Sequence, residues 1–317
     1  MNIRLPKLYD WLNRLDAWWR RDTIVAAKVP APAPVPVAPS APCRLERVVL
    51  SAGVASTLFD DYAAHCVSPR GSEEIGWILM GVRQDGEAIA LAALPAGAGR
   101  DASQVHVRFN ADAQAVASRI LRQKDKRLQI LGVVHTHPGD MCQPSSGDFT
   151  GDSAWVAKLR HGDAVFGIGT AGWNGQVPSC GALRFFWYAL GAGDTVYRPL
   201  PARVEAGPDL AAPLRPIWPI LEANAVELES LCRLFARVQF DRAEEGLVIR
   251  IALARPQNGL RVLLKGGEAR YYWERGGELI AVDPREPQLE RAVFLILAEL
   301  AKEQASEFRE VHALVES

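Results

Sequence analysis

Two histidines placed two residues apart carry the clearest chemistry in this sequence. His135 and His137 end an apolar run, and Ser145 and Asp148 follow closely. Side chains two apart on a strand share one face, so the two imidazoles would lie side by side. Two imidazoles and one carboxylate form a three-ligand set for Zn²⁺ that leaves a fourth position for water. The histidine pair alone would favour packing at a strand end, but the serine and aspartate at this spacing reverse that preference and favour the metal.

The order of these residues resembles a known motif. HTHP, six further residues and SSGD are similar to the JAMM motif of the JAB/MPN metalloproteases, His-x-His-Pro-x(n)-Ser-x-x-Asp. That family also has an upstream glutamate before an apolar strand that ends in glycine, often written E-x-x-G-x-x-x-G. The matching stretch here runs from Glu73 to Gly81. The resemblance covers about residues 43–198, roughly half of the chain.

The resemblance implies a role for each matching residue. His135, His137 and Asp148 would bind one Zn²⁺ per chain, which would activate a water molecule for amide hydrolysis. A glutamate would act as general base and later protonate the leaving nitrogen. Ser145 would donate its hydroxyl to the oxyanion, whereas its alternative role is to cap the helix that begins near Asp148. Ser146 looks better placed for that cap, which would leave Ser145 free.

Two neighbouring glutamates compete for the role of general base. Glu74 has Gly81 seven residues on but places Trp77 where the family has glycine. Glu73 has Gly76 three residues on, but Gly81 then falls one residue late. Because neighbours on a strand face opposite sides, only one can reach the metal. The ungapped strand favours Glu74, and Glu73 remains the alternative.

The elements around the motif predict an α/β (α+β) domain, with a mixed sheet flanked by helices. Strand signals alternate with helix signals, and the histidines end the strand 128–137. The expected strands are 47–50, 75–82, 88–94, 105–109, 128–137, 164–170 and 181–189, and the expected helices are 54–66, 111–124 and 146–159. The JAB/MPN resemblance implies the same fold, with zinc at the edge of a curved sheet.

The segments outside the motif suggest three further units. Residues 1–28 contain an amphipathic leucine and tryptophan stripe, which predicts a helix that docks on a partner or on its own domain. Residues 29–42 alternate proline and alanine, as a semi-rigid linker does. Residues 199–317 predict a smaller α+β domain for recognition or assembly. Its expected elements are a helix at 219–238, strands at 247–254, 260–265, 269–274 and 278–282, and a helix at 287–313.

Composition excludes several classes of protein. Of the 317 residues 49% are hydrophobic and 23% charged, and the formal net charge is −1, so no basic surface for nucleic acid is indicated. The five cysteines are scattered and form no CxxC pair, which argues against a disulfide framework and suits a cytoplasmic protein. No apolar run is long enough for a transmembrane helix or the core of a signal peptide.

The complete ligand set favours an active enzyme over the inactive scaffolds of the MPN class. We expect a zinc-dependent isopeptidase or peptidase that cleaves the amide bond after the C-terminal glycine of a ubiquitin-like protein. Similar bacterial proteins accompany ubiquitin-like conjugation operons, some in anti-phage defence. The expected partners are therefore the ubiquitin-like protein, its conjugates, and E1-like and E2-like (activating and conjugating) enzymes. The alternatives are a peptidase that processes sulfur-carrier proteins and a non-catalytic scaffold.

Overall fold

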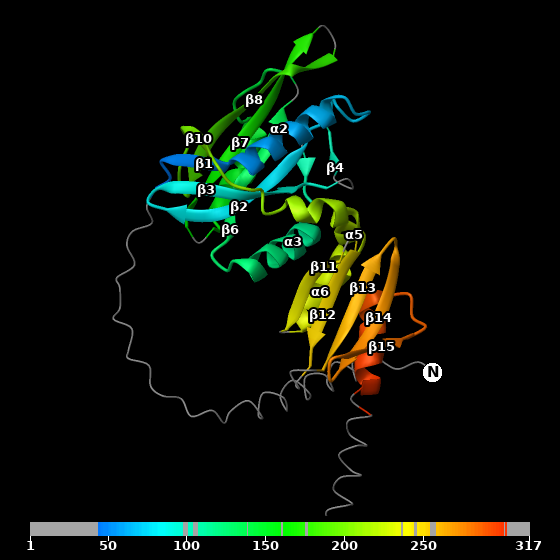
Figure 1. Cartoon of the computed structure of the whole chain (residues 1–317). Coiled ribbons are helices and arrows are strands. Elements are labelled where there is room, and N and C mark those ends of the chain that lie inside the picture. The colour runs from blue at the N-terminus through cyan, green and yellow to red at the C-terminus, as the bar shows by residue number, and fades with distance from the viewer. Residues whose placement is uncertain are drawn as a thin grey trace, which may run out of the picture.

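The computed structural model describes residues 44–302, with gaps at 98–100, 104–106, 138, 160, 175–176, 236, 244–245, 254–257 and 301. The expected N-terminal helix and the proline-alanine linker lie outside the described residues. Two sheets organise the chain, one of eight strands and one of five (Figure 1). The expected mixed sheet flanked by helices, with a second smaller α+β unit, is confirmed.

The eight-stranded sheet holds both histidines near its centre. Its strand order is β10-β1-β3-β2-β6-β7-β8-β9, with β6 parallel to β7 and antiparallel to β2. The bounds are β1 Arg47–Ser51, β2 Gly76–Gln84, β3 Glu87–Pro95, β6 Gln129–His137, β7 Asp163–Asn174, β8 Val177–Gly191, β9 Arg198–Pro199 and β10 Ala202–Glu205. The short β4 (Asp101–Ala102) and β5 (Val107–Arg108) pair separately.

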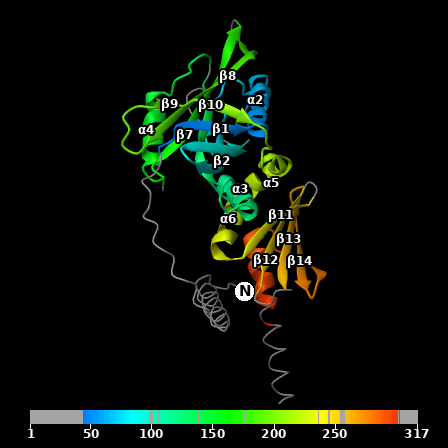
Figure 2. The same cartoon turned by 60° about the vertical axis from the view of Figure 1, so that its left-hand side comes forward.

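Helices cover both faces of this sheet (Figures 1 and 2). On one face, α2 (Ala52–Cys66) buries Val54 and Leu58 against alternate side chains of β2, β3, β6 and β7. The other face carries α3 (Ala111–Lys124), which packs on Met80 and Leu94, and α4 (Ser146–Val156), which packs over the β7–β8 end. The apolar side chains on each face of the sheet are therefore buried by a helix.

An irregularity in β6 decides which face the histidines occupy. The β2–β6 register runs from Gly76 opposite His135 to Leu79 opposite Gly132, and then shifts. Beyond the shift, Val134 packs on the α2 side, whereas Val133 packs on the α4 side. Because strand side chains alternate, His135 and His137 follow Val133 and project toward α4.

The five-stranded sheet is an antiparallel meander of consecutive strands. Its buried face packs on α5 (Trp218–Ala223), α6 (Ala225–Leu234) and the helical residues 289–300, and these share one core with α3. The 3₁₀ turn η1 (Ala212–Ile217) leads into α5. The strands are β11 Val238–Ala243, β12 Gly246–Ala252, β13 Gly259–Lys265, β14 Glu268–Arg275 and β15 Glu278–Val282. No described helix is both long and apolar enough to cross a membrane.

Some elements differ from the sequence-based expectation. Two helices, which meet at Asn224, replace the single helix expected over 219–238. Val238, the last residue of that expected helix, begins the strand β11, which was not predicted. The alternation of Val238, Phe240 and the polar residues between them suits an edge strand with one buried face. The proline-rich stretch after residue 198 contains β10, which pairs in parallel with β1 and extends the first sheet to Glu205. The α4 helix ends at Val156 rather than at residue 159.

Candidate metal centre

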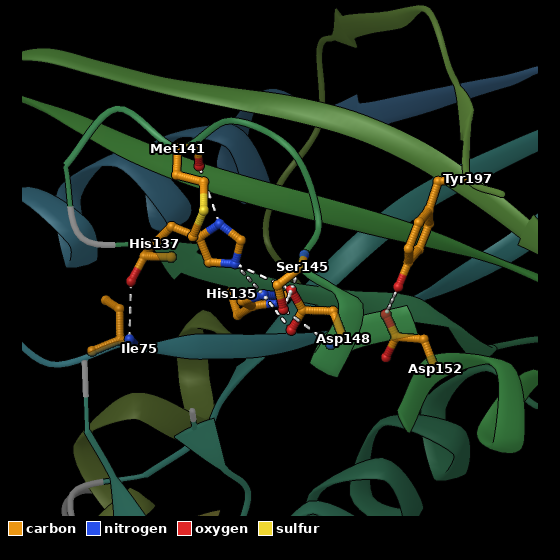
Figure 3. Close-up of polar contacts among 9 residues, drawn as sticks. Ile75, His135, His137, Met141, Ser145, Asp148, Asp152 and Tyr197 are labelled. Atoms are coloured by element: carbon orange, nitrogen blue, oxygen red, sulfur yellow. Dashed lines mark hydrogen bonds and ion pairs between the residues drawn. The ribbon is translucent and has the colours of Figure 1, made fainter. Parts of the chain in front are cut away.

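Three side chains from two elements converge at the end of β6. The Nε2 atoms of His135 and His137 lie 3.0 Å apart. The Oδ1 atom of Asp148 lies 3.3 Å from Nε2 of His135, and its Oδ2 atom lies 3.3 Å from Nε2 of His137 (Figure 3). Both histidines are buried, whereas Asp148 is partly exposed. The structure therefore brings together the three residues that the sequence predicts as ligands.

The spacing of these atoms suits a single tetrahedral metal. Ligand atoms bound at about 2.0–2.1 Å with tetrahedral angles lie roughly 3.3 Å from one another. The separations here are 3.0 and 3.3 Å, and each carboxylate oxygen of Asp148 faces a different histidine. The backbone carbonyl of Met141 lies 3.1 Å from Nδ1 of His137. A carbonyl can only accept, so Nδ1 carries the hydrogen and Nε2 is the nitrogen that would bind a metal. The donor set thus fits Zn²⁺.

The electrostatics of the cluster favour a bound cation. Burial would raise the pKa of Asp148, but hydrogen bonds from His135 and His137 hold that pKa far below its usual range. Burial would lower the pKa of His135, but Asp148 and the charge of Glu74 together raise it. A bound cation would stabilise the Asp148 carboxylate in the same way.

Glu74 lies on the same face of the sheet as the histidines. Gly76 pairs with His135, and the amide of Thr136 donates to the carbonyl of Ile75 at 2.9 Å. Continuing this register places Glu74 beside His137. Its side chain is buried, and its charge contributes to the raised pKa of His135.

Glu73 faces a different environment. Its carboxylate forms an ion pair with Arg70 at 2.6 Å and is partly exposed. Its backbone carbonyl accepts a hydrogen bond from the ring of His65 at 2.8 Å, and this bond stabilises the turn before β2. The two glutamates thus diverge as neighbours on an extended chain do, and the geometry favours Glu74 as the residue that reaches the metal.

Ser145, not Ser146, is the N-cap of α4. Its hydroxyl accepts from the amide of Asp148 at 3.1 Å and donates to Oδ2 of Asp148 at 2.7 Å. Asp148 in return accepts from the amide of Ser145 at 2.6 Å, which completes a capping box. The expectation that Ser146 caps the helix is therefore wrong, because Asp148 stands three residues after Ser145 and the reciprocal bonds require that spacing. An oxyanion role for Ser145 stays a prediction.

Two glycines, Gly76 and Gly81, allow the sheet to pack closely beneath the site. A Cβ atom on Gly81 would lie 1.9 Å from the carbonyl oxygen of Ile89. A Cβ atom on Gly76 would lie 2.9 Å from the carbonyl oxygen of Val134 and 2.8 Å from the ring of Phe109. Neither position tolerates a side chain without a shift of the backbone or of a neighbouring ring.

Three residues that support the candidate ligands were not predicted from the sequence: Tyr188, Tyr197 and Asp152. The hydroxyl of Tyr188 donates to the carbonyl of Cys142 at 2.8 Å, in the loop between the histidines and Asp148. The hydroxyl of Tyr197 donates to Oδ2 of Asp152 at 2.7 Å, one helical turn after Asp148 (Figure 3). Burial raises the pKa of Asp152 to about 6. The tyrosines lie far along the chain from their partners, so no local signal could have identified them.

The comparisons with known proteins find one family that resembles part of this chain. Residues 56–191 match the family described as prokaryotic homologs of the JAB domain. No curated protein is similar enough to count as a relative. A solution structure of a protein from Desulfitobacterium hafniense, DSY2949, is 14% identical over 50% of this chain and 94% of that chain, with a TM-score of 0.36. A likeness this low supports no statement about the fold of this chain. Residues 56–191 of this chain therefore resemble a prokaryotic JAB domain.

Proposed function

We propose that this protein is a zinc-dependent peptidase or isopeptidase that hydrolyses the amide bond after the C-terminal glycine of a ubiquitin-like protein. The observation that carries the proposal is the convergence of His135, His137 and Asp148, whose ligand atoms all lie within 4.8 Å of one another. The buried Glu74 on the same face supplies the base that such a reaction needs. A scaffold protein would need neither.

The residues divide the chemistry between them. Zinc, when bound, would make a water molecule acidic enough to ionise near neutral pH and would polarise the substrate carbonyl. His135, His137 and Asp148 would hold the metal. Glu74 would accept the proton of the attacking water and pass it to the departing nitrogen. The water oxygen would bond to the carbonyl carbon, the C–N bond would break, and the amine would leave neutral. Ser145 would stabilise the oxyanion if its hydroxyl turns away from Asp148.

The substrate class rests on the likeness to the JAB/MPN family rather than on the metal chemistry, which suits any amide. A ubiquitin-like tail would reach the site as an extended strand, a common mode of peptide recognition. The second sheet and the N-terminal segment add surface that a simple peptidase would not need. They are candidate contacts for the modifier, for its conjugates, or for activating and conjugating enzymes.

The test is cleavage of a ubiquitin-like protein encoded beside this chain and extended at its C-terminus by a short peptide. We expect release of the peptide, loss of activity with a chelator, and recovery with one equivalent of zinc. The folded modifier should be required, because most of the binding energy would come from its surface. Cleavage of denatured casein at an equal rate would contradict the substrate class.

A second experiment separates the alternatives. Cleavage of an extended sulfur-carrier protein, but of no ubiquitin-like conjugate, would favour the processing peptidase. A protein that binds zinc and cleaves neither substrate would favour the scaffold.

A further inference from the structure

We propose that Tyr188 and Tyr197 are positioning residues that hold Asp148 and the ligand loop in place, and so set the affinity for the metal. This inference deepens the proposed function, because it rests on the zinc site of His135, His137 and Asp148. It concerns two hydroxyl groups that bind neighbours of the ligands, the carbonyl of Cys142 and the carboxylate of Asp152.

The three ligands differ in how firmly the fold holds them. His135 and His137 lie on β6, which is paired on both sides by β2 and β7. Asp148 lies in the first turn of α4, at the end of a loop. Among the described residues of α4, Val156 alone is fully buried. Phe149 and Trp155 pack only partly buried against the sheet, so core packing near Asp148 is limited.

The sequence of α4 also makes the helix weak by itself. Gly147 and Gly151 lie within its first two turns, and each glycine costs a helix about 1 kcal/mol relative to alanine. A Cβ atom on Gly151 would meet nothing within 4 Å, so no close approach explains that glycine. A short helix with two glycines and one buried residue needs external anchors to keep a carboxylate in register.

Tyr197 supplies one anchor. Its hydroxyl donates to Asp152 at 2.7 Å, and its ring packs edge-on against Phe149, at 5.9 Å between centroids. Phe149 and Asp152 are the residues one and four positions after Asp148. The same ring contacts Phe166 of β7 at 5.6 Å, which joins the start of α4 to the sheet.

Tyr188 supplies the second anchor. It lies on β8 opposite Phe166, and its hydroxyl donates to the carbonyl of Cys142 at 2.8 Å. The preceding carbonyl, that of Met141, is the one that orients His137 through Nδ1. One hydroxyl on a rigid strand thus fixes the loop segment that sets the tautomer of a ligand.

The two tyrosine anchors are also in contact with each other. The rings of Tyr188 and Tyr197 lie 6.2 Å apart in an edge-on arrangement. Tyr197 immediately precedes β9, which pairs with β8 at Tyr188. Burial raises the pKa of both phenols, so both remain protonated donors over the working range of the enzyme. We call this pair the tyrosine clamp.

The test measures zinc affinity rather than activity. Tyr188→Phe, Tyr197→Phe and the double variant keep the aromatic packing and remove only the hydroxyl groups. We expect each single variant to weaken zinc binding about tenfold, within the range of 10- to 100-fold that supporting hydrogen bonds contribute. The dissociation constant is measured by competition with a chromophoric chelator, beside the melting temperature of the metal-free protein.

Two further variants sharpen the result. Tyr271→Phe is the matched control, because its buried hydroxyl has no hydrogen-bond partner among the described residues and lies in the second sheet. It should leave the zinc affinity unchanged. Asp152→Asn keeps an oxygen that accepts from Tyr197 and should retain most of the affinity, whereas Asp152→Leu should lose as much as Tyr197→Phe.

The outcomes separate this inference from the proposed function. Wild-type protein that binds no zinc contradicts the zinc site itself. Wild-type protein that binds zinc, with the same dissociation constant in all the tyrosine variants, overturns the clamp and leaves the zinc site standing. A lower melting temperature of the metal-free variants with unchanged affinity also overturns the clamp, because it shows a purely structural role.

Discussion

Ser145 and Asp148 hydrogen-bond each other in both directions, so one residue pair both begins α4 and orients a carboxylate of the candidate metal centre. The hydroxyl of Ser145 binds the amide and the carboxylate of Asp148, and the amide of Ser145 binds the same carboxylate. Oδ1 of Asp148 is left to face His135. The start of the helix and the geometry of the site are therefore coupled, and substitutions in either residue should affect both.

The first prediction separates the two serines. Ser145→Ala should lower the free energy of unfolding by about 1 kcal/mol, because the N-cap is lost. It should also lower turnover by about 10²–10³ if the hydroxyl serves the oxyanion. Ser146→Ala is the control, and an exposed residue such as this should change stability by less than about 0.5 kcal/mol. Denaturant unfolding of the metal-free proteins and steady-state kinetics measure the two effects. An equal loss of stability in both variants would contradict the cap.

The second prediction assigns the general base. Glu74→Gln should retain one zinc per chain and lose activity by at least about 10²–10⁴, the usual contribution of general acid–base catalysis. Glu73→Gln should have a small effect, because Glu73 pairs with Arg70 at the surface. Rates and zinc content are measured on the same preparations. If Glu73→Gln is the inactive variant, the assignment of Glu74 is wrong.

The third prediction concerns pH. Burial raises the pKa of Asp152 to about 6, against an ordinary value of 3.8. The folded metal-free protein therefore binds a proton at a higher pH than the unfolded chain does. The contribution of this group to stability is fully present below about pH 4 and is lost as the pH rises through about 6.

The measurement compares the metal-free wild type with Asp152→Asn between pH 4 and pH 7. The wild type should gain stability relative to the variant as the pH falls, by at most about 3 kcal/mol at 1.36 kcal/mol per pKa unit. Asp85→Asn, in an exposed turn, controls for the effects of buffer. Parallel stability curves for the wild type and Asp152→Asn would show that the carboxyl of Asp152 has an ordinary pKa.

The sequence predicted the cluster of His135, His137 and Asp148 better than it predicted the contacts that support this cluster. The spacing of His135, His137 and Asp148 is local, and α3 begins and ends at the expected residues. The tyrosine clamp depends on contacts between residues 45 and 46 positions apart, which no local pattern contains. β11 was missed because its alternation follows directly on a helix, and the sequence there offers no proline or glycine to mark the change.

The fourth prediction concerns the N-terminal segment, which lies outside the described residues. Deletion of residues 1–28 should leave cleavage of a small fused peptide unchanged and slow the processing of a full conjugate. The reason is the leucine and tryptophan stripe joined through a proline-rich linker. The ratio of the two rates, measured for the full chain and the truncated chain, is the readout. Equal ratios would assign the segment to packing.

The most direct test of the central claim is the zinc content of the purified protein by elemental mass spectrometry. We expect about one zinc per chain in the wild type, and almost none in the His135→Ala/His137→Ala double variant, because one carboxylate alone does not hold the ion. The double variant must first be shown to be folded by circular dichroism. A wild type without zinc, or a folded double variant that retains one equivalent, would contradict the claim.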